Sequence, residues 1–404
     1  MKRHFIKKYI FTIIFMLCLF VYAGINFACE LPILHNALKN FDWENIDTEV
    51  LELENTINDN VYEKYAWIEA FGAVQEVIGT DVDNGFSHVK STSGALNYAD
   101  EGSNDVILQE NIEAIQKVNQ MAAAYGATPI VLLAPDVYVE GEDEFCEGIP
   151  YLDKNEELDK VRQAVEGKKI VCVDSRDYLE EIAEWTNEPI FFDTDHHWRI
   201  KPAFYMAGIL MDEMDKNWNG LLNPNGFYSN IDNYNVYTYE DCFLGSMGRE
   251  TGIVYAGLDD IDLIYPKYET NFVHTYISTE DSEPKTVEGE FVNSILDLYN
   301  FNNTDDIYLS DKYSTYLDSV NSQDYITNVL RQDGPRVLII RDSFMAPAAA
   351  FLANVCSEMD MVWSMRYTGD LEELISQGGY DYVIVELGST NLNDTDLLQC
   401  IKNK

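Results

Sequence analysis

The sequence predicts an α/β protein built on one doubly wound, mainly parallel sheet, with a strand-and-loop insertion and an N-terminal membrane helix. Short apolar segments alternate with helical ones both before and after a tyrosine-rich middle region, and a basic cluster followed by an apolar stretch opens the chain. Short buried strands joined through helices are typical of parallel sheets that are covered on both faces. A chain of 404 residues with 46% hydrophobic content can bury the core that such a sheet requires.

Residues 1–29 read as an N-terminal signal anchor or signal sequence. Basic residues crowd the first eight positions, and nineteen mostly apolar residues, 10–28, follow them. As a helix at ~1.5 Å per residue this stretch covers roughly 28 Å, which is enough to cross a hydrocarbon core and longer than a usual signal-peptide apolar region. The cationic flank predicts that the N-terminus stays inside. We therefore expect a single-pass protein of the cell membrane whose domain faces outside, or a secreted protein if the signal is cleaved.

Charge and cysteine content exclude several classes of function. The formal net charge is -43, so phosphates would be repelled, and we expect no nucleic-acid partner. An acidic surface of this kind favours solubility in an exposed compartment. The seven cysteines show no CxxC spacing that would indicate a zinc site or a redox pair. No cofactor is expected.

The first half of the chain divides into two segments. Residues 30–100 are expected to be a stalk and lead-in segment in which no chemistry is visible. Residues 101–216 form the first part of the predicted α/β domain, and Gly126 and Gly167 end two of its helices. The predicted elements are helix 106–125, strand 129–134, helix 155–166, strand 169–173, helix 176–184 and helix 202–214.

The second half begins with residues 217–335, which are rich in tyrosine and contain alternating apolar and polar runs. This pattern indicates an insertion of strands and loops. Residues 336–404 return to the earlier alternation and form the second part of the domain. Because the same pattern flanks the insertion, we expect one sheet assembled from both parts. The predicted elements are strand 337–340, helix 346–355, an apolar segment at 361–365, helix 371–377 and strand 382–385.

One predicted strand ends in residues that suit nucleophilic chemistry. Strand 337–340 delivers Arg341, Asp342 and Ser343 to the carboxyl end of the sheet, where ligands bind in open parallel sheets. Ser343 then opens a helix, whose first N–H groups can stabilise an oxyanion. Ser343 is therefore a candidate nucleophile, although Asp and Ser at this place also suit a plain helix cap.

A serine nucleophile needs a base, and two of the six histidines are adjacent, His196 and His197. A carboxylate on the same loop can hold one ring nitrogen, fix the tautomer and stabilise the imidazolium. Two registers are available, Asp193 with His196 and Asp195 with His197. The same four side chains would also suit a metal ion. From the residues alone, a general base and a metal site both remain open.

Asp195-His196-His197-Trp198 is similar to the namesake motif of the DHHW protein family. More broadly it resembles the Asp-x-His-Trp motif of the alginate O-acetyltransferase group within the SGNH hydrolases, and the similarity in arrangement covers residues 100–404. In that superfamily the Asp-Ser motif normally comes first, but the alginate-type proteins resemble a circular permutation in which the order is reversed. This chain has the reversed order. The resemblance implies an SGNH-hydrolase-like, circularly permuted fold.

The resemblance also implies catalytic roles. Ser343 matches the nucleophile of the Gly-Asp-Ser motif, with Arg341 in place of its glycine. His197 matches the base and Asp195 matches its orienting acid. We prefer this register because Trp198 follows His197 directly, as in the permuted group.

Further positions follow from the same comparison. Asp193 and His196 would match the Asp-x-x-His of unpermuted relatives and stay the alternative acid and base. The family's oxyanion hole usually adds a Gly and an Asn, for which Gly388 and Asn391 are the candidates, although Asn391 stands one position late. Arg249, in a glycine-rich run of the insertion, is a further candidate for substrate binding.

The function that the resemblance implies is O-acyl, mainly O-acetyl, transfer or ester cleavage on cell-surface polysaccharide. Family members commonly work beside a membrane-bound O-acyltransferase that passes acyl groups across the bilayer, and no metal is implied. Two alternatives stay open. One is a non-catalytic accessory or glycan-binding protein of an acetylation system, which the replacement of glycine by Arg341 favours. The other is a metal-dependent hydrolase.

Overall fold

The chain forms two units, Met1–Val74 and Gln75–Lys404, in a computed structural model. The structure describes all residues except those at positions 1, 40, 42, 44, 45, 84, 86, 100, 101, 138–144, 146, 147, 150–153, 280, 281, 303–305, 319, 403 and 404.

The first unit is helical, and its leading helix fits the predicted membrane segment. The helices are α1 (Lys2–Lys39), α2 (Ile46–Asp59) and the start of α3 (Lys64–Ile78). Within α1, residues Tyr9–Lys39 are long and apolar enough to cross a membrane, by length and composition. The chain after α2 packs back on α1, because the Tyr22 hydroxyl donates to the Tyr62 carbonyl and the Trp67 ring lies 5.3 Å from the ring of Tyr22.

The second unit contains an eight-stranded sheet in the order β5-β4-β13-β11-β12-β10-β8-β9. The five strands from β5 to β12 pair in parallel, whereas β10, β8 and β9 add antiparallel pairs at one edge. The bounds are β4 (Thr128–Ala134), β5 (Val171–Asp174), β8 (Phe272–Ile277), β9 (Lys285–Gly289), β10 (Gln323–Asn328), β11 (Arg336–Arg341), β12 (Glu358–Trp363) and β13 (Tyr382–Gly388).

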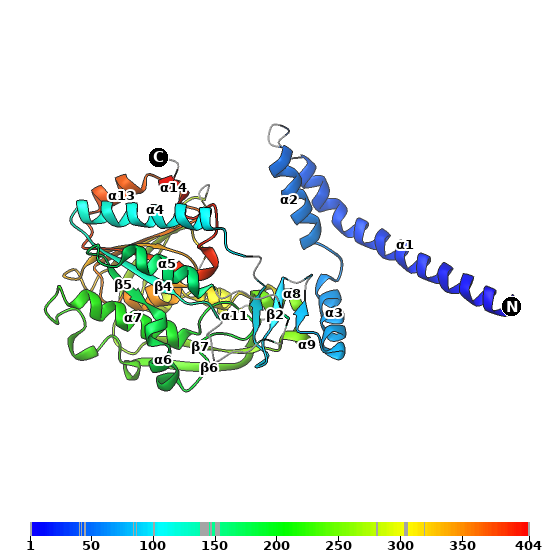
Figure 1. The fold of residues 1–404 in the computed structure, drawn as a ribbon, viewed down its shortest axis with the longest axis horizontal. Coiled ribbons are helices and arrows are strands. Elements are labelled where there is room, and N and C mark those ends of the chain that lie inside the picture. Colours follow the sequence, from blue (N-terminus) through cyan, green and yellow to red (C-terminus); the bar gives the residue numbers. More distant parts are fainter. Residues whose placement is uncertain are drawn as a thin grey trace. The chain divides into compact units, whose positions relative to one another are not determined.

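Helices cover both faces of this sheet, as the sequence predicts (Figure 1). Along β11, Val337 and Ile339 enter one core, and Leu338 and Ile340 enter the other. This alternation follows from the period of two in a strand. The helices of the first core are α6 (Leu179–Thr186), α7 (Ile200–Asp215) and α12 (Met345–Leu352), and those of the second are α4 (Asp105–Ala124), α5 (Asn155–Val165), α13 (Leu371–Gly378) and α14 (Gln399–Lys402).

The insertion is more closely joined to the sheet than the sequence suggests. Three of its strands, β8, β9 and β10, extend the main sheet. The remainder forms a separate hairpin of β6 (Tyr234–Phe243) and β7 (Asp259–Pro266), joined through α8 (Ser246–Thr251) and α9 (Ile253–Ala256), while α10 (Phe291–Ser294) and α11 (Leu298–Asn302) follow β9.

A small antiparallel sheet precedes the main domain. Its strands are β1 (Val82–Asp83), β2 (His88–Lys90) and β3 (Leu96–Tyr98). Leu96 packs with Met247 and Tyr255 of the insertion, and its backbone N–H donates to the Asp193 carbonyl over 2.8 Å. The lead-in segment, for which the sequence shows no chemistry, is therefore in contact with the histidine motif.

Candidate active site

The histidine motif and the serine turn meet beyond the carboxyl end of β11. Ser343 lies between β11 and α12, and its side chain is half-buried. Residues 191–198 form a loop that is closed by a β-bridge between Phe191 and Trp198. The Trp198 indole N–H donates to the Phe344 carbonyl over 3.0 Å. Because Trp198 is buried, this bond ties the histidine loop to the serine turn.

Three side chains form one chain of hydrogen bonds. His197 Nε2 lies 2.7 Å from Ser343 Oγ, and His197 Nδ1 lies 2.5 Å from Asp195 Oδ1. Since an ionised carboxylate can only accept, Nδ1 carries the proton and the Nε2 lone pair faces the Ser343 hydroxyl. The arrangement lets Nε2 take the hydroxyl proton.

Backbone donors and an aromatic ring hold this chain in place. Asp195 Oδ1 also accepts the His197 N–H over 3.1 Å, and Asp195 Oδ2 accepts the Ser246 N–H over 2.6 Å. The Tyr313 ring stacks on the imidazole of His197 with centroids 4.0 Å apart. Both carboxylate oxygens of Asp195 and the tautomer of His197 are thus fixed before any substrate binds.

The electrostatics of the loop favour an ionised Asp195. Burial alone would raise the pKa of Asp195, but the charges of His197 and His196 and the hydrogen bonds lower it, and the net pKa lies well below its ordinary value. Burial and the neighbouring His197 lower the pKa of His196 to about 4. His196 is therefore neutral at neutral pH.

The alternative register, Asp193 with His196, is arranged differently. The Asp193 side chain is exposed, and its backbone N–H donates to Asp259 Oδ1 over 2.9 Å. His196 Nδ1 instead lies 3.2 Å from Ser246 Oγ, and its ring lies 5.6 Å from that of Tyr98. The structure brings Asp195, but not Asp193, into the hydrogen-bonded chain.

Asp259, which the sequence analysis does not single out, clamps the histidine loop from β7. Its carboxylate accepts the Thr194 N–H over 2.8 Å, the Thr194 hydroxyl over 2.7 Å and Arg199 Nη2 over 2.8 Å. The pairing with Arg199 places a charge next to a buried acid, which offsets part of its desolvation. The insertion therefore supplies part of the support for the site.

The glycine-rich run that contains Arg249 supports the loop through its glycines. A Cβ at Gly245 would lie 2.5 Å from the Thr194 carbonyl oxygen and 2.7 Å from the Asp195 Cα, closer than real atoms approach. Arg249 itself is half-buried in α8, and its charge opposes the rise in the pKa of Tyr98 that burial causes. Among the described residues the Arg249 guanidinium has no hydrogen-bond partner in the catalytic chain.

Gly388 and Asn391, the expected oxyanion donors, both donate to Asp342 in this structure. The Gly388 N–H and the Asn391 amide each donate to Asp342 Oδ2 over 2.8 Å, and the Phe344 N–H donates to Asp342 Oδ1 over 2.9 Å. The Gly388 N–H therefore stabilises the serine turn and is not free to donate to an oxyanion. Within the described part of the chain, the Ser343 N–H has no partner, and one hydrogen of the Asn391 amide is also unspent.

A buried acid of β13, Glu386, supports the same turn. The Asp342 N–H donates to Glu386 Oε2 over 3.0 Å, and Glu386 is fully buried. Burial and the charge of Asp342 raise the pKa of Glu386 well above its ordinary value. The shift favours the protonated form of Glu386 beside the carboxylate of Asp342.

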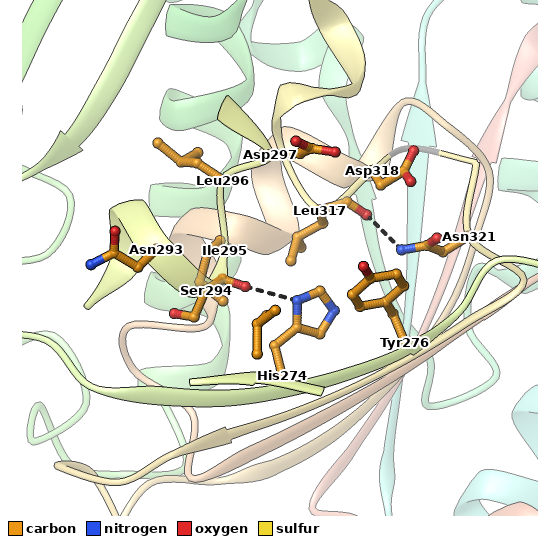
Figure 2. A pocket seen from close by; sticks show the side chains of 11 residues that line it. His274, Tyr276, Asn293, Ser294, Ile295, Leu296, Asp297, Leu317, Asp318 and Asn321 are labelled. Atoms are coloured by element: carbon orange, nitrogen blue, oxygen red, sulfur yellow. Dashed lines mark hydrogen bonds between the residues drawn. The ribbon is translucent and has the colours of Figure 1, made fainter. Parts of the chain in front are cut away.

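Arg341, which replaces the expected glycine, points away from the chemistry. It is fully buried, and its Nη2 donates to Asp324 Oδ2 of β10 over 3.1 Å. Asp324 Oδ1 in turn lies 3.0 Å from His274 Nε2. Figure 2 shows His274 with Tyr276 and other side chains around a pocket, and none of Ser343, His197 and Asp195 lines it. Arg341 thus joins β11 to the inserted edge of the sheet.

Three residues of the motif also have the composition of a metal site. Asp195, His196 and His197 each offer one ligand atom, and these atoms lie within 4.8 Å of one another. The fit is incomplete, because both oxygens of Asp195 and both nitrogens of His197 already face hydrogen-bond partners. Asp193 is not a member of this group.

Comparison with known proteins agrees with the predicted family. The family described as DHHW protein matches residues 168–362, and the family described as SGNH hydrolase-like domain, acetyltransferase AlgX, matches residues 95–232. No curated protein matches the sequence significantly.

Solved structures share the fold at low sequence identity. A DHHW family protein from Eubacterium siraeum has 16% identity and a TM-score of 0.53, covering 78% of this chain and 98% of its own. PatB1 of Bacillus cereus with a sulfonyl adduct has 16% identity and a TM-score of 0.61, covering 76% and 97%. A second PatB1 structure has 14% identity and a TM-score of 0.60, covering 77% and 99%. This chain therefore shares its fold with these proteins, and parts of its sequence match the DHHW and SGNH hydrolase-like family models.

Proposed function

We propose that this protein is a serine-dependent O-acyl, most directly O-acetyl, transferase or esterase that acts outside the cytoplasmic membrane on cell-surface polysaccharide. The observation that carries the proposal is the hydrogen-bonded chain from Ser343 through His197 to Asp195. The match to the AlgX acetyltransferase domain supports acyl chemistry over other reactions of serine.

In the proposed reaction the Ser343 oxygen attacks the carbonyl carbon of an acyl ester while His197 Nε2 takes the hydroxyl proton. The tetrahedral intermediate collapses to acyl-Ser343, and His197 gives the proton to the departing alcohol. A sugar hydroxyl or water then attacks the acyl-serine, with His197 again taking and returning a proton. Asp195 stays ionised throughout and holds the imidazolium.

The Ser343 N–H and the unspent amide hydrogen of Asn391 are the proposed oxyanion donors. Asp342 positions both: it accepts the Phe344 N–H next to Ser343, and it accepts one amide hydrogen of Asn391 from the segment after β13. Donors fixed before the reaction stabilise the developing charge without reorganisation. Gly388 acts through Asp342, and is proposed as a positioning residue.

The apolar helix α1 supports a membrane-tethered location. A tether would hold the domain beside a membrane-bound O-acyltransferase, which is the proposed source of acyl groups. Cell-surface polysaccharide is the proposed acceptor.

The test uses the full-length protein in detergent with 4-nitrophenyl acetate as the acyl donor. We expect Ser343→Ala and His197→Ala to lose activity by roughly a thousandfold or more, and His196→Ala to keep most of it. A reversed pattern between the two histidines would assign the base to His196. An inactive wild-type protein that still binds polysaccharide would favour the accessory function.

A metal-dependent hydrolase is the second candidate, because Asp195, His196 and His197 lie within ligand distance of one another. Chelation separates the two. The serine mechanism predicts that activity survives dialysis against EDTA, whereas loss of activity that zinc restores would favour the metal mechanism.

A further inference from the structure

The insertion contains a cavity that the proposed reaction does not use. Its volume is about 290 Å³, and Tyr239 of β6, Phe301 of α11, Ser310 and Lys312 are among the residues that line it. None of the catalytic residues is among its lining. The lining is mainly apolar with a few polar groups, the composition typical of sites for small ligands.

Lys312 places a buried positive charge in this cavity. The residue is 3% exposed, and its ammonium donates to the Phe301 carbonyl over 2.8 Å and lies 5.4 Å from the centroid of the Phe301 ring. Among the described residues no carboxylate forms an ion pair with it. Asp241, which also lines the cavity, is exposed and is not paired with it. Within the described part of the chain, two of the three ammonium hydrogens are not used by protein acceptors.

Among the described residues, Arg341, which is buried, and Arg199, which is half-buried, are both paired with acids. Arg341 contacts Asp324, and Arg199 contacts Asp259. A buried charge without a partner destabilises the folded state. The chain has 70 acidic residues and a net charge of -43, yet no carboxylate within the described part of it pairs with Lys312.

A second polar group of the cavity also lacks a partner. The Ser310 hydroxyl is buried and forms no hydrogen bond within the described part of the chain. A hydroxyl and an ammonium together can satisfy both oxygens of a carboxylate. One ammonium in a mainly apolar cavity suits a monoanion better than a phosphate, which requires more donors.

We propose that this cavity binds a small organic carboxylate. Lys312 pairs with the carboxylate group, Ser310 donates to it, and the rings of Tyr239 and Phe301 contact the rest of the ligand. A free organic acid and a carboxylate-bearing sugar share this chemistry, so both are included in the test.

The experiment measures binding by isothermal titration calorimetry on the full-length protein in detergent. The probes are benzoate and glucuronate, each with an uncharged counterpart, benzamide and glucose. We expect at least one acid to bind at least tenfold more tightly than its counterpart. Binding by benzoate alone identifies an aromatic or aliphatic acid, and binding by glucuronate alone identifies a sugar acid. No saturable binding of either acid overturns the proposal.

Variants locate the binding and test the fold. Lys312→Met keeps an unbranched side chain one atom shorter and removes the charge, and should abolish the preference for the acid. Lys285→Met removes an exposed lysine from β9 and should leave the preference unchanged. A preference that survives in Lys312→Met would overturn the proposal.

Thermal unfolding supplies an independent readout. Lys312→Met should unfold at the same temperature as the wild type or a higher one, because the unpaired buried charge is gone. The acid that binds should raise the unfolding temperature of the wild type and not that of the variant. A lower unfolding temperature for Lys312→Met, with no effect of the acids on the wild type, would assign Lys312 a purely structural role and overturn the proposal.

Discussion

Replacing Asp195 by asparagine is the sharpest test of the catalytic chain. Three N–H groups point at the Asp195 carboxylate: His197 N–H and Nδ1–H at Oδ1, and Ser246 N–H at Oδ2. An asparagine has one acceptor oxygen and one NH2 group in their place. In either orientation the new NH2 group faces a backbone N–H, of Ser246 or of His197, and neither group can accept a hydrogen bond.

The two orientations damage the site differently. If the NH2 group faces Ser246, the His197 tautomer is kept but the charge that stabilises the imidazolium is lost. If it faces His197, Nδ1 must become the acceptor, the proton moves to Nε2, and the ring can no longer take the Ser343 proton. Both outcomes leave an unsatisfied buried donor, which costs about 1–3 kcal/mol of stability.

We expect kcat/KM to fall about ten-thousand-fold in Asp195→Asn, the loss typical of a wrong tautomer in a Ser-His-Asp arrangement. This corresponds to about 5 kcal/mol of transition-state stabilisation. The assay is 4-nitrophenyl acetate hydrolysis, with urea unfolding to verify the fold. Asp193→Asn is the matched control and should keep near wild-type activity, because its side chain is exposed. If Asp195→Asn keeps more than a tenth of the activity, or Asp193→Asn loses as much, the reasoning is wrong.

Three further changes test the support of the site. Gly245→Ala should lower both activity and the free energy of unfolding, because its Cβ would meet the backbone of Thr194 and Asp195, and circular dichroism with the ester assay would detect both losses. Trp198→Phe should lower the free energy of unfolding by about 1–3 kcal/mol through loss of the bond to the Phe344 carbonyl, measured in urea. The pKa of His196 is lowered to about 4 from 6.5, so between these pH values the unfolded chain binds the proton and the folded protein does not, and the free energy of unfolding rises with pH. His196→Gln should reduce that rise by up to about 3 kcal/mol, measured by urea unfolding across this pH range. An unchanged rise would contradict the assignment.

The parallel part of the fold could be predicted from the sequence because its strands are buried on both faces. Strand β4 is apolar at nearly every position, and the predicted 129–134 differs from the observed Thr128–Ala134 by one residue. Strand β12 begins earlier than its apolar segment, at Glu358, because Glu358 and Asp360 alternate with buried methionines. A strand with one partly exposed face alternates polar and apolar residues, and this pattern is harder to recognise than a continuous apolar run.

The inserted edge of the sheet could not be predicted for a related reason. Strand β10 alternates buried residues with more exposed ones. This pattern indicates that one face of the strand is covered, but it does not indicate which strands β10 pairs with. Long-range supports such as Asp259 had no local signal, since an acid after a turn is usually exposed. The partner of Gly388 and Asn391 was equally hidden, because Asp342 reads in sequence as a helix cap.

The position of β13 constrains how the chain can fold. This strand is the last one made, yet it lies between β4 and β11, pairing Ile130 with Ile384 and Ile339 with the same residue. Closing so large a loop has a high entropic cost, and such non-local pairings form slowly. Until the final residues are available, β4 and β11 present apolar strand edges that invite aggregation. A nascent or C-terminally shortened chain can therefore contain both motifs and still have no site.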